Sequence, residues 1–147
     1  MVQFEVVQLE KSALNEVYSF LEEIFTREQN IPKELIPLPF DEQYWWCAKN
    51  NKQIIGTVAA WKDTDDWHWG RLAVDPIFRG HGFGKKLAVK SFEFLFEKDI
   101  DRIVIDARDI TVKLLLSLGA SINGKTVKFY GIPITPMIIY KTDFKAG

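Results

Sequence analysis

The chain has 147 residues, of which 47% are hydrophobic and 14% aromatic, and its formal net charge is −1. This length fits one ordinary domain with a sizeable core, so we expect a single domain over residues 1–147. The balanced charge argues against nucleic acid as the main partner, and no apolar run approaches the roughly 20 residues that cross a bilayer.

The first half of the chain predicts one helix and four strands. In order, the expected elements are a strand at 4–10, a helix from about 12 to 26, a loop at 28–43, strands at 44–49 and 53–62, a turn at 63–66 and a strand at 67–75. Ser12 is the expected helix N-cap, and three prolines define the loop. The start of the chain alternates and carries acidic residues, which is unlike a signal peptide.

The second half predicts helices that cross over between strands. The expected elements are a helix at about 84–97, a strand at 102–107, a helix at 109–119 and strands at about 122–130 and 134–142, the last two split by Gly-Ile-Pro. Asp109 is the expected N-cap of the second helix and Gly119 its C′ residue. Three hairpin-linked strands followed by crossover helices predict an α/β fold with a mixed sheet and helices on both faces.

Cysteine usage indicates a reducing compartment. Cys47 is the only cysteine, so no internal disulfide can form, and we expect a cytoplasmic protein. A lone cysteine could be a nucleophile, but its strand-like surroundings (YWWCAKN) favour a small buried hydrophobe.

The stretch VDPIFRGHGFGKKL, residues 74–87, joins a strand to a helix through three glycines on alternate positions. A P-loop would require one more residue and a hydroxyl at Lys86, and a dinucleotide fingerprint would require G-x-G-x-x-G. Gly82 and Gly84 allow backbone N–H groups to approach an anion at the start of the helix, and nearby basic side chains add positive charge. The stretch therefore predicts a phosphate-binding loop of another kind.

Arg79, Gly82 and Gly84 form an R-x-x-G-x-G pattern after LAVDPIF, which resembles motif A of the GNAT acyltransferases (Gcn5-related N-acetyltransferases). IFTREQNIP at 24–32 and GIPITPM at 131–137 resemble the VFxxEQxIP and GIPHxxM segments of a bacterial subfamily. The resemblance implies the GNAT fold, a mixed and mostly antiparallel sheet of about six or seven strands with helices on both faces and two splayed strands.

The same resemblance implies acetyl-CoA as cosubstrate and no metal. Its pyrophosphate would lie on the glycine stretch, and its pantetheine would pair with strand backbone just before it. The implied binding residues are Leu72, Ala73, Val74, Arg79, Gly80, His81, Gly82, Phe83, Gly84 and Lys85.

His68 is the candidate general base. It lies four residues before Leu72, where several GNAT members place a glutamate or histidine, and imidazole ordinarily titrates near pH 6.5. The alternative is a structural histidine packed among tryptophans. Two acidic features remain open: Asp63, Asp65 and Asp66 could attract an amine but favour a solvated turn, and Glu28 is near the acceptor by resemblance alone.

The chain departs from the family where many members carry a tyrosine that protonates the leaving thiolate. That position is Leu115, the preceding phenylalanine is Leu114, and the subfamily histidine after GIP is Ile134. Tyr130 or Tyr140 could replace the donor, and core packing accounts for the leucines otherwise.

We therefore expect an acyl-CoA-dependent N-acyltransferase that transfers acetyl to a primary amine of a small molecule or peptide. A catalytically weak acyl-CoA-binding module is the alternative. We expect neither nucleic acid nor membrane as partner, and a homodimer is left open.

Overall fold

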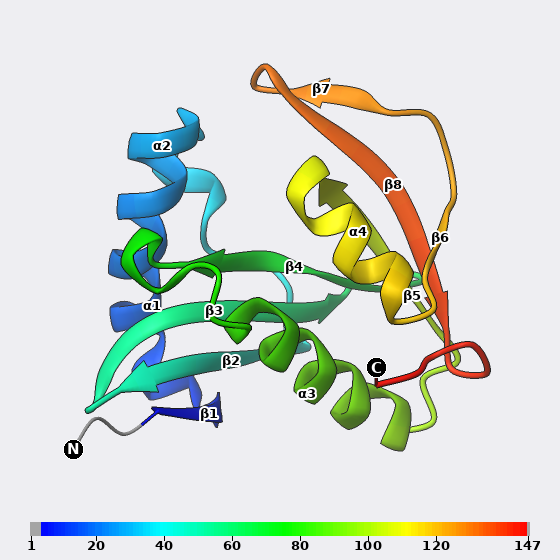
Figure 1. Cartoon of the computed structure of the whole chain (residues 1–147), viewed down its shortest axis with the longest axis horizontal. Coiled ribbons are helices and arrows are strands. Elements are labelled where there is room, and N and C mark those ends of the chain that lie inside the picture. Colours follow the sequence, from blue (N-terminus) through cyan, green and yellow to red (C-terminus); the bar gives the residue numbers. More distant parts are fainter. Residues whose placement is uncertain (1–3, 147) are drawn as a thin grey trace.

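A computed structural model describes residues 4–146, so residues 1–3 and 147 lie outside the description. Its centre is an eight-stranded sheet with the order β1-β2-β3-β4-β5-β8-β6, and β7 also pairs with β8 (Figure 1). The strands are β1 Phe4–Leu9, β2 Gln43–Asn50, β3 Gln53–Lys62, β4 Trp67–Val74, β5 Arg102–Arg108, β6 Ser121–Ile122, β7 Val127–Phe129 and β8 Ile132–Tyr140. Neighbouring strands are antiparallel except β4 and β5. The expectation of a mixed, mostly antiparallel sheet is confirmed, with eight strands instead of six or seven.

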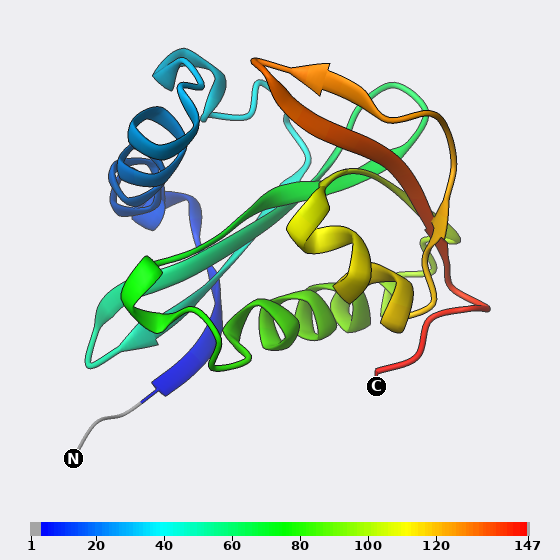
Figure 2. The same ribbon diagram turned by 45° about the horizontal axis from the view of Figure 1, so that its top comes forward.

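Helices cover both faces of the sheet, as the sequence predicts (Figures 1 and 2). On one face lies a continuous helical segment made of α1 Leu14–Leu21, the π-helical turn η2 Glu22–Thr26 and α2 Arg27–Gln29. On the other lie α3 Phe83–Glu97 and α4 Asp109–Ser117. Each layer has its own apolar core, one around Leu21, Trp45 and Ile36, the other around Trp46, Leu87 and Phe92.

Aromatic side chains fill the core beneath α3. Trp69 of β4 is 2% exposed and stacks on Phe92 at 5.0 Å between ring centroids. Its indole Nε1–H donates to the buried Ser91 hydroxyl at 2.8 Å, and Ser91 in turn donates to the Ala88 carbonyl. A buried donor without a partner would cost about 1–3 kcal/mol, so this bond allows a polar edge to be packed inside.

Strands β4 and β5 pair over only part of their length. The parallel ladder joins Trp67–Trp69 to Ile103–Ile105 and stops there, although β4 continues to Val74 and β5 to Arg108. The register of β3 and β4 shifts between Thr57 and Ala59, and Arg71 of β4 has a φ of 58°. An extra residue in left-handed conformation is typical of a β-bulge, which bends a strand away from its neighbour. The two central strands therefore separate toward their C-terminal ends.

The first helix begins and ends later than expected. Ser12 lies inside a 3₁₀ turn, η1 Lys11–Ala13, and the residue before α1 is Ala13, with no side-chain cap. The helical segment then runs on to Gln29, so Glu28 is helical and not part of a loop, and Asn30 ends it with a φ of 55°. A further 3₁₀ turn, η3 Lys33–Leu35, follows the first proline. Asparagine tolerates the left-handed conformation, so the helical segment can end at Asn30. The prolines of the following loop predict an earlier end, near residue 26.

The C-terminal half differs at two boundaries. Asp109 is the first residue of α4 and not its cap, because Arg108 occupies the cap position without a side-chain hydrogen bond. Strands β7 and β8 are separated by Tyr130 and Gly131, whose φ values are 51° and 78°, and not by Gly-Ile-Pro. Two consecutive left-handed residues are typical of a tight hairpin turn, so β8 already begins at Ile132. Within residues 4–146, no helix has the length and apolarity to cross a membrane.

Candidate active site

Two cavities lie where β4 and β5 separate. The larger, of about 360 Å³, is walled partly by Trp61 and Trp69, and we call it the tryptophan cavity. The smaller, of about 220 Å³, is walled by the glycine stretch, and we call it the loop cavity. Both are lined by Leu72, Arg108 and Thr111. The two cavities therefore meet at the point where the parallel ladder ends.

The loop cavity is built largely from main chain. Gly80 and Gly82 have φ values of 83° and 84°, and Gly82 is the N-cap of α3. A Cβ added at Gly80, Gly82 or Gly84 would meet nothing within 4 Å, so open space lies over this backbone. The first N–H groups of a helix have no intrahelical partner and favour an anion.

Most residues predicted to bind the cosubstrate come together at this cavity. Those that line it are Leu72, Ala73, Val74, Arg79, Gly80, Gly82, Phe83 and Gly84. His81 and Lys85 are exposed and do not line it. The η4 turn, Pro76–Phe78, leads into the glycines and is capped by Asp75, whose carboxylate accepts from the backbone N–H of Ile77 at 3.0 Å.

Arg79 is held in place by two partners that the sequence did not indicate. Its Nε donates to the Val74 carbonyl at 2.8 Å, and its guanidinium forms a 3.0 Å ion pair with Glu28 of α2. Glu28 and Arg79 are 51 residues apart in the chain, so no local pattern reveals the pair. The positive charge expected at the glycine stretch is therefore partly offset by a carboxylate.

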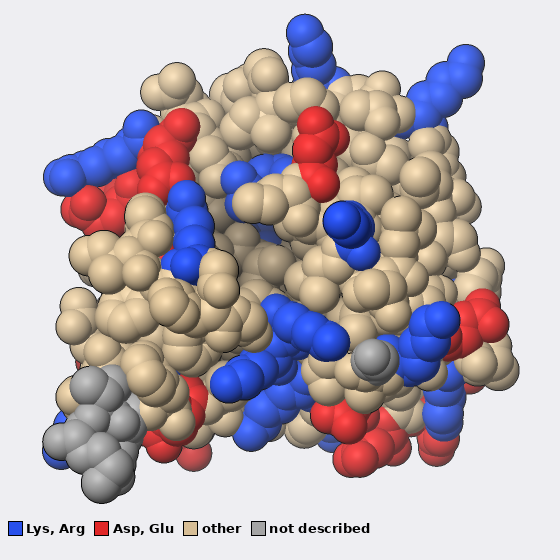
Figure 3. Space-filling model, viewed as in Figure 1, with Lys and Arg blue, Asp and Glu red and all other residues tan. Residues whose placement is uncertain are grey.

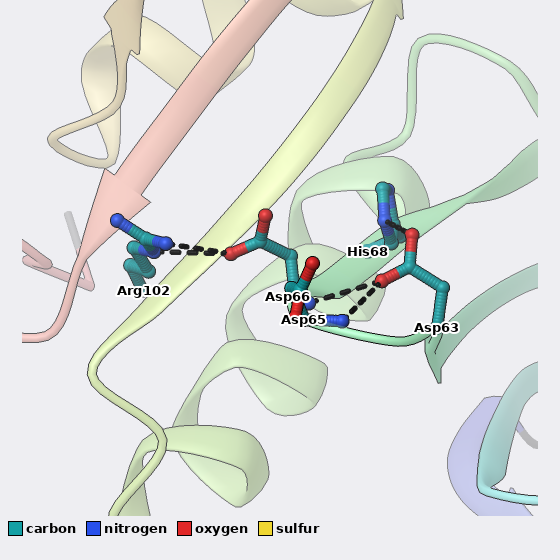
Figure 4. A network of polar contacts seen from close by, with 5 residues as sticks. All are labelled: Asp63, Asp65, Asp66, His68 and Arg102. Atoms are coloured by element: carbon teal, nitrogen blue, oxygen red, sulfur yellow. Dashed lines mark hydrogen bonds and ion pairs between the residues drawn. The ribbon is translucent and has the colours of Figure 1, made fainter.

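His68 lines the tryptophan cavity and is paired with Asp63 (Figure 4). The distance between His68 Nε2 and Asp63 Oδ2 is 2.5 Å. The other carboxylate oxygen of Asp63 accepts from the backbone N–H groups of Asp65 and Asp66 at 3.1 and 3.0 Å. The hydrogen bond from the Asp66 amide is the main cause that lowers the pKa of Asp63, and those from Asp65 and His68 add to it. The carboxylate thus stays ionised beside the imidazole.

The acidic turn at residues 63–66 is mainly structural, and only Asp63 contacts a side chain that lines the tryptophan cavity, that of His68. Asp66 forms an ion pair with Arg102 of β5 at 3.0 Å, which ties the turn to the neighbouring strand (Figure 4). Asp65 contributes its backbone N–H to the Asp63 carboxylate. Asp63 was interpreted as part of a solvated turn, and its contact with His68 is the feature that the sequence interpretation missed.

His68 is also packed against a tryptophan, as the structural alternative predicts. Its ring stacks on Trp61 with 5.8 Å between centroids and 10° between planes. The Arg71 guanidinium lies over the same indole at 5.4 Å and donates to the carbonyls of Leu35 and Ile36. His68 therefore does both: its ring packs on Trp61, and the residue also lines the tryptophan cavity.

Two polar groups of the tryptophan cavity have no partner among the described residues. The Arg108 guanidinium is half-buried, and no hydrogen bond or ion pair engages it within residues 4–146. Desolvation by burial lowers the pKa of Arg108, with a further contribution from Arg79, while Glu28 opposes the shift. The side-chain oxygen of Gln29 is buried without a hydrogen bond. Neither residue stood out in the sequence.

No tyrosine side chain lines either cavity. Leu115 and Leu118 are fully buried in the core, as the packing interpretation predicts, and Leu114 borders the loop cavity. Tyr140 pairs with Arg102, at the opposite end of β5 from Arg108, so it is far from both cavities. Tyr130 lies in the exposed β7–β8 turn and packs its ring edge-on against Phe129, which does line the tryptophan cavity.

Cys47 lies in the core, away from both cavities. Cys47 is fully buried in β2, and desolvation raises the pKa of its thiol to about 11, which agrees with a packing role. The described part of the chain contains no cluster of three or more histidine, cysteine or acidic side chains that could hold a metal ion.

The face seen in Figure 3 is hollowed near its centre, and Lys and Arg side chains lie at the edge of the hollow and gather below it.

Comparison with a protein-family model shows the family to which the chain belongs. The model described as the acetyltransferase (GNAT) family matches residues 14–120, which include both central strands and the glycine stretch. The chain belongs to the GNAT acetyltransferase family. It is accordingly an enzyme of the N-acetyltransferase type, and the predicted membership of the GNAT family is confirmed. No curated protein sequence matches it as a relative.

Solved GNAT structures share the fold over nearly the whole chain. Escherichia coli ElaA is 20% identical with a TM-score of 0.79, covering 95% of this chain and 99% of its own. An acyl-CoA N-acyltransferase from Pseudomonas aeruginosa is 16% identical with a TM-score of 0.80 and the same coverage, 95% and 99%. The ribosomal-protein-S18-alanine N-acetyltransferase of E. coli is 16% identical with a TM-score of 0.71, covering 99% and 97%.

Proposed function

We propose that this GNAT enzyme transfers an acetyl group from acetyl-CoA to a primary amine of a small molecule or peptide. The observation that carries the proposal is the meeting of the two cavities at Leu72 and Arg108, with a phosphate-suited helix start on one side and a histidine–carboxylate pair on the other. Acyl transfer requires these parts to face one another, because donor and acceptor must react without leaving the site.

The loop cavity suits the pantetheine and pyrophosphate of coenzyme A. The open space over Gly80, Gly82 and Gly84 would admit phosphate oxygens to the N–H groups that begin α3. Leu72, Ala73 and Val74 lie beyond the end of the β4–β5 ladder, so their backbone is available to a ligand that adds to β4 on the β5 side. Their backbone N–H groups would also polarise the thioester carbonyl.

His68 is the proposed base, held by Asp63. An ionised carboxylate only accepts hydrogen bonds, so Nε2 of His68 donates to Asp63 and Nδ1 keeps a lone pair for a proton. The amine nitrogen bonds to the acyl carbon, the carbon–sulfur bond breaks with its electron pair on sulfur, and the proton lost by the amine passes to His68, directly or through water.

The leaving thiolate has no tyrosine donor at this site. A thiol ordinarily titrates near pH 8.5, so the thiolate is a tolerable leaving group without protonation. The presence of Leu115 at the usual tyrosine position also favours the second candidate, a catalytically weak module that binds acyl-CoA. Turnover distinguishes the two.

The acceptor proposal includes peptide amines because the similar E. coli structure is named for a protein alanine. A cytoplasmic setting is part of the proposal, and the lone buried Cys47 supports it.

The test combines binding with turnover. Calorimetry measures the affinity for CoA and acetyl-CoA, and release of free thiol with a panel of primary amines measures transfer, with the acetylated product identified by mass. Binding with amine-dependent turnover supports the enzyme, whereas binding without turnover of any amine supports the module. Folded protein that binds no acyl-CoA at millimolar concentration overturns both.

A further inference from the structure

We propose that the tryptophan cavity is an acceptor site for amines that also carry a carboxylate and an apolar body, with Arg108 as the carboxylate ligand. Hydrophobic amino acids are the class that combines these groups. The proposal rests on the proposed acyl transfer and names the substrate class of that same site.

Arg108 carries the strongest part of the argument. It is the last residue of β5, it lines the tryptophan cavity, and no hydrogen bond or ion pair engages its guanidinium among residues 4–146. Glu28 attracts the guanidinium electrostatically without forming an ion pair with it, so the N–H donors of this half-buried cation stay available to a ligand. The planar guanidinium matches a carboxylate through two parallel N–H···O bonds, so a carboxylate is the ligand that it fits best.

Gln29 lines the same cavity from the end of α2. Its side-chain oxygen is buried and accepts no hydrogen bond within the described chain, so a ligand in the cavity does not reach this oxygen, and Gln29 is not assigned as a ligand. The neighbouring residue Glu28 contributes electrostatically at Arg108, and Gln29 and Arg108 line one cavity, so the end of α2 faces the end of β5.

The charges of the cavity oppose a polycation. Three basic side chains line it, and Asp106 is the only carboxylate among its lining residues, since Asp63 lies behind His68. Arg71 is already bound to the carbonyls of Leu35 and Ile36, whereas Arg108 and Lys128 have no such partner in the described structure. A polyamine would bring several positive charges to a site that already holds an excess of them.

The rest of the wall is apolar and suits a hydrophobic side chain. Its large apolar members come from η2, the loop after α2, β3, β4 and the β7–β8 hairpin, and include Phe25, Ile31, Trp61, Leu72, Val127 and Phe129. A cavity of about 360 Å³ lies at the small end of ligand pockets, which agrees with an amino acid more than with a folded protein surface.

The experiment compares amines that differ only in the carboxylate. Leucine, phenylalanine and tryptophan are each assayed beside their carboxamides, with spermidine as the polycation, in the full chain with saturating acetyl-CoA. We expect kcat/KM for the best amino acid to exceed that of its carboxamide by about 10- to 100-fold, the range of one charge-assisted pair. R108Q should remove this preference by lowering the amino acid alone.

A matched control removes one charge elsewhere. Lys113 is exposed on α4 and lines neither cavity, so K113Q should keep the preference of the wild type. A wild-type preference for the carboxamide or for spermidine overturns the proposal. So does an R108Q variant that lowers both members of each pair equally with weaker CoA binding, because Arg108 also borders the loop cavity and would then be a CoA ligand.

Binding separates this proposal from the failure of catalysis. If no amine is acetylated, calorimetry of the same amino acids and carboxamides is performed on the CoA complex. Amino acid binding that R108Q abolishes and K113Q retains supports the carboxylate site although the proposed function fails. Absence of amino acid binding to the wild type overturns the site.

Discussion

The loop cavity and the tryptophan cavity adjoin each other but are built from different parts of the chain. The first is made mainly of one stretch, residues 72–84, and exposes the start of α3. The second gathers side chains from η2, α2, β3, β4, β5 and the β7–β8 hairpin. A site that recognises its ligand through main chain needs only glycines and a helix start, whereas a site that recognises side-chain chemistry needs the whole fold to assemble it.

The largest expected effect tests the side-chain half of this comparison. His68→Ala should lower kcat by about 10²- to 10⁴-fold, because general base assistance has that magnitude. The acidic limb of the pH–rate profile should disappear with it, since protonation of the imidazole removes the base at low pH. Steady-state kinetics from pH 5 to 9 measures both.

Affinity for CoA is the internal control for His68→Ala. It should remain that of the wild type, because His68 lines only the tryptophan cavity. Wild-type rates at every pH would show that His68 is a packing residue against Trp61 and not the base.

The second effect tests the main-chain half. Gly84 has an ordinary helical conformation in the first turn of α3, and a Cβ there would meet no protein atom within 4 Å. Gly84→Ala should therefore keep or raise stability by about 0.4–1 kcal/mol, since alanine restricts the unfolded chain. Its methyl group would occupy the space over the amides, and we expect the affinity for CoA to fall by about tenfold or more, equivalent to about 1.4 kcal/mol. Calorimetry and thermal unfolding check the two halves of the prediction.

Gly119→Ala is the matched opposite. Gly119 has a φ of 104°, and its added Cβ would collide with the Asp143 carbonyl oxygen. We expect it to destabilise folding by about 1–3 kcal/mol, the range for strained backbone, without changing CoA affinity in the folded fraction. If Gly84→Ala instead loses stability and keeps its affinity, the helix start is not the phosphate site.

A smaller effect separates the two members of the His68–Asp63 pair. Asp63→Asn should lower kcat about tenfold while the acidic limb remains, because the imidazole is still present but less well oriented. The backbone hydrogen bond from Asp66 is the main cause that lowers the pKa of Asp63, so this carboxylate cannot itself produce a limb near neutrality. A profile whose limb vanishes in Asp63→Asn as completely as in His68→Ala would contradict this division of roles.

The contrast between the cavities also explains what the sequence could predict. The fold class and most strands follow from local periodicity, and the lining residues from Leu72 to Gly84 follow from the resemblance of the glycine stretch to the GNAT motif. The Asp63–His68 contact could have been considered, because the two residues are only five positions apart across a tight turn. The sequence of an acidic turn does not, however, show in which direction each carboxylate points. Gln29 and Arg108 could not be predicted, since their lack of partners is a property of the assembled structure.

The smallest expected effect concerns the ion pair that links α2, beside the tryptophan cavity, to Arg79 at the loop cavity. The Glu28–Arg79 ion pair is about 40% exposed on both sides, with 42% for Arg79 and 38% for Glu28, so it contributes little to stability, roughly 0–1 kcal/mol. Glu28→Gln removes the carboxylate that offsets Arg79, and the freed guanidinium can then meet a phosphate. We expect a rise of about two- to fivefold in CoA affinity that shrinks as salt increases. Glu23→Gln breaks a comparable 3.0 Å pair with Arg27 on the same helical segment and should leave the affinity unchanged. Weaker CoA binding in Glu28→Gln would mean that the ion pair positions Arg79 at the phosphate and does not withhold it.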